Sequence, residues 1–149
     1  MILRLMKYTL FALILVASTA FACNHSVAET NGEGIEFKHI TLKEALALAE
    51  KENKVVFIDA YTTWCGPCKR MARKTFTNPD VAAYYNEHFI NIKIDMEKGE
   101  GPGLEKKYDI YHYPTLLFLE SNGKKRKKVI GYHEPAEFIR LGKKVMRKS

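Results

Sequence analysis

The sequence predicts an α/β protein with a central mixed β-sheet flanked by helices on both faces. Short β-branched and aromatic runs alternate with amphipathic segments of helical period, which is the pattern of strands and helices in turn. The last two strand-like runs follow one another across an Asn122-Gly123 turn, as in a hairpin. At 149 residues, 46% of them hydrophobic, the chain has enough apolar side chains for one domain of ordinary size.

Residues 1–22 have the features of a signal peptide and are not expected in the fold. A basic start is followed by an apolar run over residues 8–16 and by a small-x-small cleavage pattern at residues 20–22. The apolar run is too short for an ordinary membrane-spanning helix. We therefore expect an exported protein whose mature chain begins at Cys23.

Cys23 allows two interpretations. A bacterial lipoprotein carries a lipid-modified cysteine at this position, which Ala22 suits and the bulky Phe21 does not. Ordinary cleavage after Ala22, leaving an incidental thiol, is the alternative. Residues 23–34 are polar and contain glycine, so we expect a flexible tether before a domain over residues 35–149.

The elements of the domain can be placed in chain order. Thr41 and Glu44 form a capping box that opens the first helix. The β-branched and aromatic residues 55–61 form the first strand. The remaining predicted elements are a helix over 69–74 with Pro67 in its first turn, a helix over 81–87, a strand over 89–95, a glycine-rich loop over 97–103 with a short helix ending near Tyr108, strands over 116–119 and 128–132, and a closing helix over 134–147.

The stretch Trp64-Cys65-Gly66-Pro67-Cys68 lies directly after the first strand and separates two thiols by three positions. Cys65 is expected at a helix N-terminus, where free N–H groups and the helix dipole favour a thiolate. Cys68 lies one turn further along, within reach for a disulfide. So small a loop would gain only about 2 kcal/mol of stability from the bridge. A reversible redox couple is therefore a better interpretation than a structural staple.

Two other uses of a cysteine pair fit the sequence less well. A zinc site would need a second pair of ligands, and the remaining cysteine is Cys23, while the histidines show no ligand spacing. Covalent haem attachment requires a histidine after the second cysteine, where Lys69 stands. We therefore predict neither a metal nor a cofactor.

These residues resemble the thioredoxin family. The resemblance covers roughly residues 38–145, and it rests on the segment 57–69 with both cysteines, on Tyr113-Pro114-Thr115-Leu116-Leu117-Phe118 and on Gly131 in a late strand. It implies a thioredoxin-like fold in which Pro114 is a cis-proline facing the cysteines. No proline follows Cys68 within the helix, since Arg73 occupies that place, and the loop between residues 95 and 114 is long. In both features the chain resembles the exported thioredoxin-like domains of disulfide-interchange proteins more than it resembles the cytosolic thioredoxin.

Asp59 is an acid inside an apolar strand, six residues before Cys65. Burial there should raise its pKa, and such an acid can relay a proton to a thiol. The resemblance implies that it assists the second cysteine; a solvated aspartate facing the sheet edge is the alternative. Where the family has a lysine beside this acid, the sequence offers Asn91, with Lys93 two residues on. The sequence therefore does not predict an Asp–Lys pair.

The expected substrate contacts surround the cysteines. A cis Pro114 would turn the Tyr113 backbone outward, so that an extended substrate could pair there as an added strand. A trans, purely structural proline is the alternative. Trp64 is expected to shield the edge of the disulfide, although a packing role fits it nearly as well. The full set of expected contacts is Trp64, Gly66, Pro67, Tyr113 and Pro114.

The chain is basic, with a formal net charge of +7, and the excess gathers at residues 124–128 and near the C-terminus. An exported protein rarely meets nucleic acid, so we predict no nucleic-acid partner. A solvated turn after Gly123, or weak attraction to an anionic membrane or to acidic partners, fits the first basic run better.

The sequence thus predicts an exported, periplasmic thiol–disulfide oxidoreductase, either soluble or anchored through a lipid on Cys23. No histidine lies between Cys65 and Cys68 to stabilise the thiolate strongly, which favours reduction of disulfide-containing proteins with electrons from a membrane donor. An exported oxidase or isomerase is one alternative. A peptide-binding adaptor with vestigial cysteines is the other.

Overall fold

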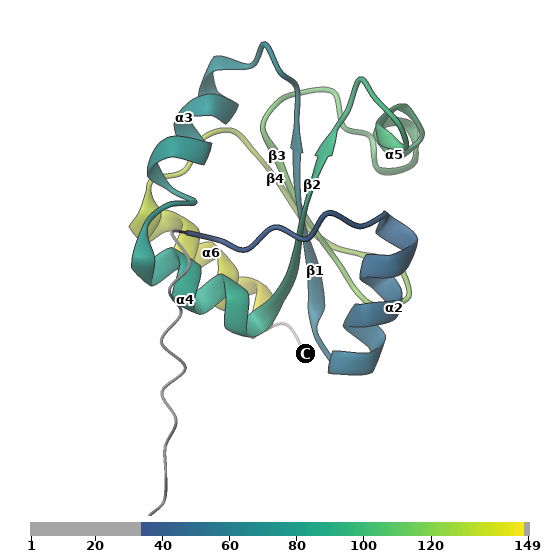
Figure 1. Ribbon diagram of the computed structural model, residues 1–149, viewed down its shortest axis with the longest axis horizontal. Helices are drawn as coiled ribbons and strands as arrows, with labels where there is room; N and C mark the ends of the chain where they lie inside the picture. Colours follow the sequence, from purple (N-terminus) through teal and green to yellow (C-terminus); the bar gives the residue numbers. More distant parts are fainter. Residues whose placement is uncertain (1–33, 148–149) are drawn as a thin grey trace, which may run out of the picture.

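The computed structural model describes residues 34–147 (Figure 1). The predicted signal peptide and Cys23 lie outside these residues. Among residues 34–147, no helix is both long and apolar enough to cross a membrane. The elements, labelled as in Figure 1, are α2 (Leu42–Glu52), β1 (Val55–Tyr61), α3 (Gly66–Lys74), α4 (Pro79–His88), β2 (Phe89–Asp95), α5 (Gly101–Tyr108), β3 (Thr115–Leu119), β4 (Lys125–Ile130) and α6 (Pro135–Met146).

The four strands form one mixed sheet in the order β2-β1-β3-β4. β2 runs parallel to β1, β3 runs antiparallel to β1, and β4 runs antiparallel to β3. As a result, the C-terminal ends of β1 and β2 and the N-terminal end of β3 meet at one end of the sheet. The loops that leave or enter the strands there carry the cysteine pair and Pro114.

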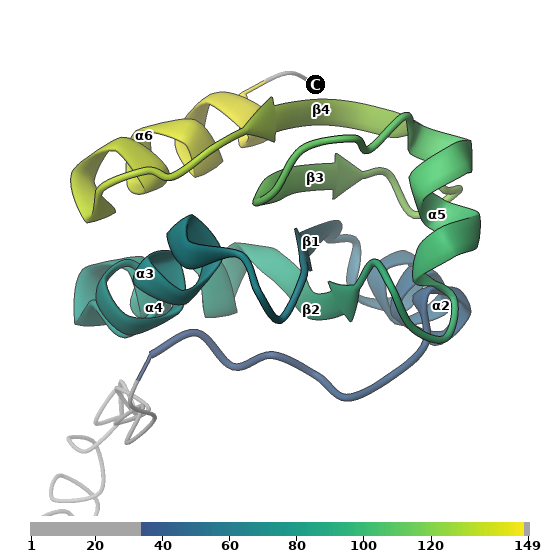
Figure 2. The same ribbon diagram turned by 90° about the horizontal axis from the view of Figure 1, so that it is seen from above.

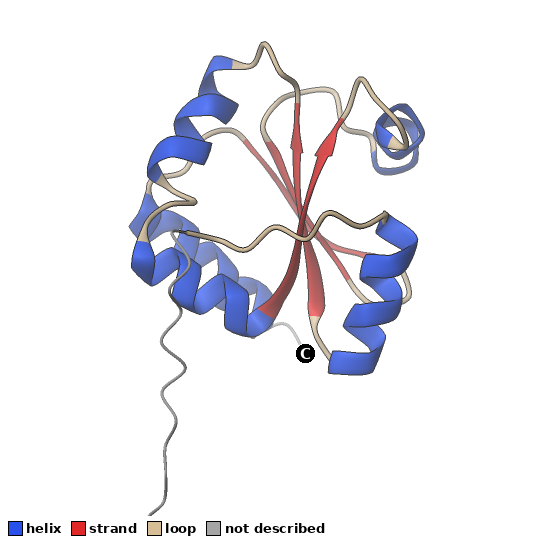
Figure 3. Cartoon of the chain, in the orientation of Figure 1, coloured by secondary structure: helices blue, strands red, loops and turns tan. Residues whose placement is uncertain are grey.

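Helices cover both faces of the sheet, which confirms the predicted architecture (Figures 1 and 3). Helices α3, α4 and α6 lie on one face, where Phe57 of β1 packs against Met71, Tyr85 and Phe138 in one apolar cluster. Helices α2 and α5 lie on the other face, over a second cluster that contains Leu42 and Leu104. Alternate residues of β1 therefore enter different cores, and the strand is buried on both faces.

Phe57 packs against three other aromatic rings in the first of these cores. Its ring lies 5.1 Å from the Phe118 ring, 5.3 Å from the Tyr85 ring and 5.4 Å from the Phe138 ring, measured between centroids. The Tyr85 hydroxyl donates a hydrogen bond to the Phe138 carbonyl at 2.9 Å, so its polar atom is satisfied inside the core. This packing joins β1 to α4 and α6 and fixes the strand from which the cysteine loop departs.

Residues 35–40, which precede α2, run beside β2 (dark blue in Figure 2). The Ile35 N–H donates to the Phe76 carbonyl at 2.7 Å, and the Lys38 N–H donates to the Asn91 carbonyl at 2.8 Å. Lys38 also forms a single parallel bridge with Ile92. The outer edge of β2 is therefore partly covered, whereas β4 forms the opposite edge of the sheet.

The hairpin differs in detail from its prediction. The turn at Gly123 forms as expected, with φ of 80°, but β4 begins at Lys125 and ends at Ile130, before Gly131 with φ of 99°. Most of the basic run is thus a strand rather than a solvated turn. Lysine has a low strand propensity, and pairing with β3 overrides it here. Lysines on an edge strand also discourage pairing with another chain.

Candidate active site

The loop between β1 and α3 places the cysteines at the start of a helix. The chain turns with a hydrogen bond from the Cys65 N–H to the Thr62 carbonyl at 3.3 Å, and Cys65 is the N-cap of α3. The Cys65 sulfur accepts a hydrogen bond from the Cys68 N–H at 3.2 Å. Pro67 lies in the first turn, where its missing N–H breaks no helical hydrogen bond. The predicted position of Cys65 at a helix N-terminus is confirmed.

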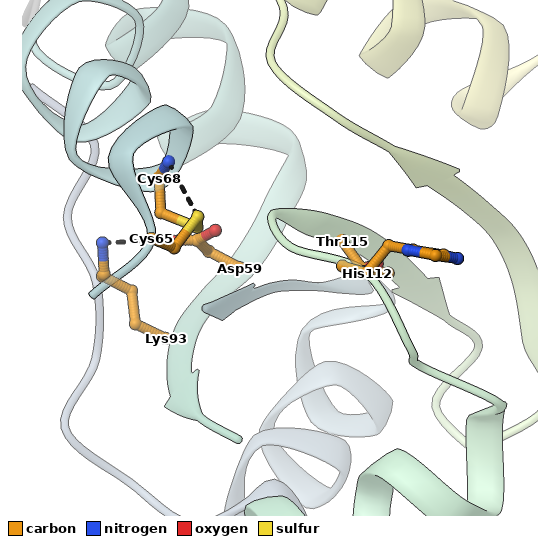
Figure 4. Close-up of a disulfide and its surroundings, with 6 residues drawn as sticks. All are labelled: Asp59, Cys65, Cys68, Lys93, His112 and Thr115. Atoms are coloured by element: carbon orange, nitrogen blue, oxygen red, sulfur yellow. Dashed lines mark hydrogen bonds and ion pairs between the residues drawn. A yellow bond between two sulfur atoms is a disulfide. The ribbon is translucent and has the colours of Figure 1, made fainter. Parts of the chain in front are cut away.

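Cys65 and Cys68 are joined by a disulfide, with their Cα atoms 5.3 Å apart (Figure 4). Both residues are largely buried, with 3% and 5% of their surface exposed, so exposure does not distinguish them. Their surroundings do. Cys65 caps the helix, whereas Cys68 lines a pocket of about 240 Å³ together with Tyr61, Thr62, Thr63, Lys69, Ala72 and Lys93.

Asp59 lies within β1 and is almost completely buried, with 1% of its surface exposed. Its Oδ2 forms an ion pair with the Lys93 Nζ at 2.9 Å, and neither carboxyl oxygen has an aligned hydrogen-bond partner within residues 34–147 (Figure 4). Burial raises the pKa of Asp59 above its ordinary value of 3.8, and the Lys93 ammonium opposes that rise in part. A solvated aspartate at the sheet edge is therefore ruled out.

The pairing of Asp59 with Lys93 corrects the sequence-based expectation, which placed Asn91 beside the acid. The parallel register of β1 and β2 sets Asp59 opposite Lys93 and Phe57 opposite Asn91. A signal for this was available, because Asp59 and Lys93 are both the fifth residue of their strands. Asn91 is buried instead, and its Nδ2 donates to the Tyr85 carbonyl at 3.2 Å.

Trp64 lies at the rim of the site, with 65% of its surface exposed. Its indole N–H donates a hydrogen bond to Glu97 Oε1 at 2.9 Å, and its ring meets the Tyr113 ring edge-on with centroids 6.0 Å apart. Sequence reasoning missed Glu97, which lies in the loop after β2. The parallel arrangement of β1 and β2 brings that loop beside the one that carries Trp64.

The segment before β3 faces this site from the other side. The Tyr113–Pro114 peptide bond is cis, as the resemblance implied. The Thr115 hydroxyl donates to the His112 carbonyl at 2.6 Å, which ties the segment together. Figure 4 shows the His112 side chain turned away from the disulfide. Gly66 lies between the cysteines with open space around it, since a Cβ there would meet no atom within 4 Å.

The side chains of the site offer sulfur chemistry. Among the described residues, no three histidine, cysteine or carboxylate side chains gather closely enough to hold a metal ion. A dithiol at a helix N-terminus, with a buried ion-paired acid whose partner shares a pocket with Cys68, can exchange electron pairs and protons with another disulfide.

Comparison with known proteins places the chain. The family model of the thioredoxin-like domain matches residues 42–146. The thiol:disulfide interchange protein DsbD of Neisseria meningitidis is 33% identical over 101 residues, which is 66% of this chain and 17% of the relative. The chain thus spans about a sixth of the length of that relative.

Two solved structures match this chain over nearly the whole of their own length. The C-terminal domain of N. meningitidis DsbD in its oxidised form is 28% identical, with a TM-score of 0.60, over 74% of this chain and 98% of that one. A solution structure from Bacteroides thetaiotaomicron, provisionally assigned as a disulphide-isomerase, is 44% identical, with a TM-score of 0.70, over 79% of this chain and 98% of that one. Since the family match also runs through all four strands of the sheet, the chain belongs to the thioredoxin-like family of disulfide oxidoreductases.

Proposed function

We propose that this protein is an exported thiol–disulfide oxidoreductase that reduces disulfides in other proteins through Cys65 and Cys68. The observation that carries the proposal is the disulfide at the N-terminus of α3, where the Cys65 sulfur already accepts a backbone N–H. That hydrogen bond and the helix dipole stabilise negative charge on Cys65 once the pair is reduced. Cys65 is therefore the attacking sulfur.

The reaction balances with two sulfur atoms on each side. The Cys65 thiolate attacks one sulfur of the substrate disulfide, forming a mixed disulfide and releasing the other substrate sulfur as a thiolate. Cys68 then loses its proton and attacks Cys65, which releases the second substrate thiolate and leaves the Cys65–Cys68 disulfide. The substrate gains two electrons and the protein loses them.

Asp59 is the group we assign to the proton of Cys68. Its ion-pair partner, Lys93, lines the same pocket as Cys68, so the ion pair lies beside the second cysteine. A carboxyl with a raised pKa changes its protonation state closer to neutral pH, as a proton relay requires. Trp64, Gly66, Pro67, Tyr113 and Pro114 are the proposed substrate contacts, and Trp64 is held in place by Glu97.

Export and a reducing direction complete the proposal. A reductase in an oxidising compartment needs a source of electrons, and a membrane donor is the natural one for a protein with the signal sequence expected at residues 1–22. Relatives named thiol:disulfide interchange proteins support exchange with protein disulfides. The provisional assignment of the Bacteroides relative favours isomerisation as the second candidate.

The reduction potential of the Cys65–Cys68 pair tests the direction. We expect a value on the order of −250 mV, close to thioredoxin, because Gly66 and Pro67 add no cation to stabilise the thiolate. Equilibration with a glutathione buffer, followed by the fluorescence of Trp64, measures it. A potential above about −170 mV would favour the isomerase or oxidase instead. An insulin-reduction assay with dithiothreitol separates either enzyme from an adaptor, which would show no rate above background.

A further inference from the structure

Lys93 is surrounded by aromatic rings as well as paired with Asp59. Its Nζ lies 4.9 Å from the centroid of the Tyr61 ring, 5.1 Å from that of Phe37 and 5.2 Å from that of Phe76. We call Phe37, Tyr61 and Phe76 the aromatic cage. The three rings come from the segment before α2, from the end of β1 and from the turn after α3.

The aromatic cage opposes the tendency of the Lys93 side chain to leave the ion pair for water. Lys93 retains 30% side-chain exposure, and a lysine stem with many rotamers gains entropy and hydration by swinging into water. The electron-rich faces of the rings attract the ammonium and occupy the space around it. The rings also support each other, since Phe37 and Phe76 meet edge-on at 5.1 Å. The ammonium is thereby kept against the buried carboxylate.

We propose that Phe37, together with Tyr61 and Phe76, positions the Lys93 ammonium against Asp59 and so controls the proton that Asp59 exchanges with Cys68. The inference rests on the proposed thiol–disulfide exchange and adds three positioning residues to it. In this role each of the three acts through Lys93. Through Phe37, the segment before α2 contributes a positioning residue to the site.

The groups around Asp59 give the direction of the effect. Lys93 faces it from β2, Cys68 and Lys69 line the neighbouring pocket from α3, and Tyr61 completes that pocket from β1. The charged groups beside Phe37, Glu36 and Lys38, pair with each other at 3.3 Å. If the cage is opened, Lys93 moves towards water and opposes the effect of burial less, so the pKa of Asp59 rises further. Less carboxylate is then present at neutral pH to accept the Cys68 proton.

Phe37→Leu is the test, with Phe37→Tyr as the variant that restores a ring. Phe89→Leu is the matched control, because Phe89 belongs to the same apolar cluster and forms no contact with Lys93 among the cation–ring contacts of the described chain. Two quantities are measured on the full chain between about pH 5 and about pH 9. The first is the carboxyl ¹³C titration of Asp59 in the reduced protein. The second is the rate at which a mixed disulfide formed on Cys65 is resolved by Cys68.

We expect Phe37→Leu to move the Asp59 midpoint upwards and to slow resolution at neutral pH by about twofold to thirtyfold, the range for one lost cation–π contact. The rate should recover at high pH, and Phe37→Tyr should restore both quantities. A midpoint equal to that of the wild type, or a shift that Phe89→Leu reproduces, would overturn the inference. A shifted midpoint with an unchanged rate profile would overturn its catalytic half. The ¹³C titration needs no turnover, so failure of the proposed function would be seen separately, as a wild-type protein that resolves no mixed disulfide.

Discussion

Asp59 joins the stability of the protein to its proposed chemistry. Its pKa is raised in the folded state because burial disfavours the carboxylate more than Lys93 favours it. The associated stability is therefore fully present below the ordinary pKa of 3.8 and is lost as pH rises through the raised value. Each unit of the rise removes about 1.4 kcal/mol at higher pH.

Asp59→Asn should therefore unfold at a higher temperature than the wild type at about pH 8, with the difference shrinking towards about pH 3. Thermal unfolding across this interval measures the effect. Asp80→Asn, at an exposed aspartate of α4, is the control and should not reproduce the trend. A variant less stable than the wild type at about pH 8 would mean that Lys93 stabilises the carboxylate more than burial destabilises it. Activity should fall in Asp59→Asn even where its stability rises.

Glu97 should act through Trp64. Glu97→Ala removes the acceptor of the indole N–H, whereas Glu97→Gln keeps an oxygen acceptor and removes only the charge. We expect Glu97→Ala to lower kcat/KM for reduction of insulin by about twofold to tenfold, the value of one hydrogen bond, and Glu97→Gln to stay near the wild type. Steady-state rates decide the matter. If kcat/KM falls equally in both variants, the charge of Glu97 matters rather than its hydrogen bond to Trp64.

At the scale of elements, the start of α3 makes the two cysteines unequal. Cys65 caps the helix and accepts the Cys68 N–H, while Cys68 lies inside the first turn. Alkylation of the reduced protein at about pH 6 should therefore modify Cys65 well before Cys68, since the thiolate is the reactive form. Peptide mapping by mass spectrometry measures the order. Labelling of Cys68 first would reverse the roles proposed for the two sulfurs.

Helix α5 contains a matched pair of glycines that tests its packing. A Cβ on Gly101 would collide with the Asp95 carbonyl oxygen and lie 2.6 Å from Met96 Cα, whereas a Cβ on Gly103 meets nothing within 4 Å. Gly101→Ala should destabilise the fold by about 1–3 kcal/mol. Gly103→Ala should be neutral or stabilise it by up to about 1 kcal/mol, because alanine favours a helix. Denaturant unfolding of both variants measures this, and equal effects would contradict the close approach at Gly101.

Elements with local signals were predictable, and contacts set by pairing were not. The capping box at Thr41 forms as the sequence indicates, with the Thr41 N–H bonded to Glu44 at 2.8 Å. The partner of Asp59 depends on the register of two strands far apart in sequence, and β4 depends on β3 for its formation. Phe37 precedes the first predicted helix in a stretch without periodicity, so nothing local pointed to its contact with Lys93.

At the scale of the whole molecule, the two edges of the sheet differ. Residues 35–40 partly cover β2, and lysines line β4. A partly covered edge and a charged edge both resist pairing with a second chain. The substrate contacts proposed above lie instead at the end of the sheet that carries the disulfide.

Export is the prediction that concerns the chain as a whole. If residues 1–22 are a signal peptide, protein recovered from its natural source should begin at Cys23. Intact-mass measurement would distinguish a bare cysteine from one that carries lipid. Recovery of native protein that still begins at Met1 would be incompatible with export.

The segment before α2 changes where this domain should be considered to start. The match to the family model begins at Leu42, so a fragment cut to the matched residues 42–146 would retain all of the labelled helices and strands. It would nonetheless lack Phe37 and the Lys38–Ile92 bridge, and Lys93 would face open solvent on that side. Such a fragment could resemble the intact protein in its circular dichroism and differ from it in the pKa of Asp59. For this chain, the smallest unit that folds and the smallest unit that functions need not share a boundary.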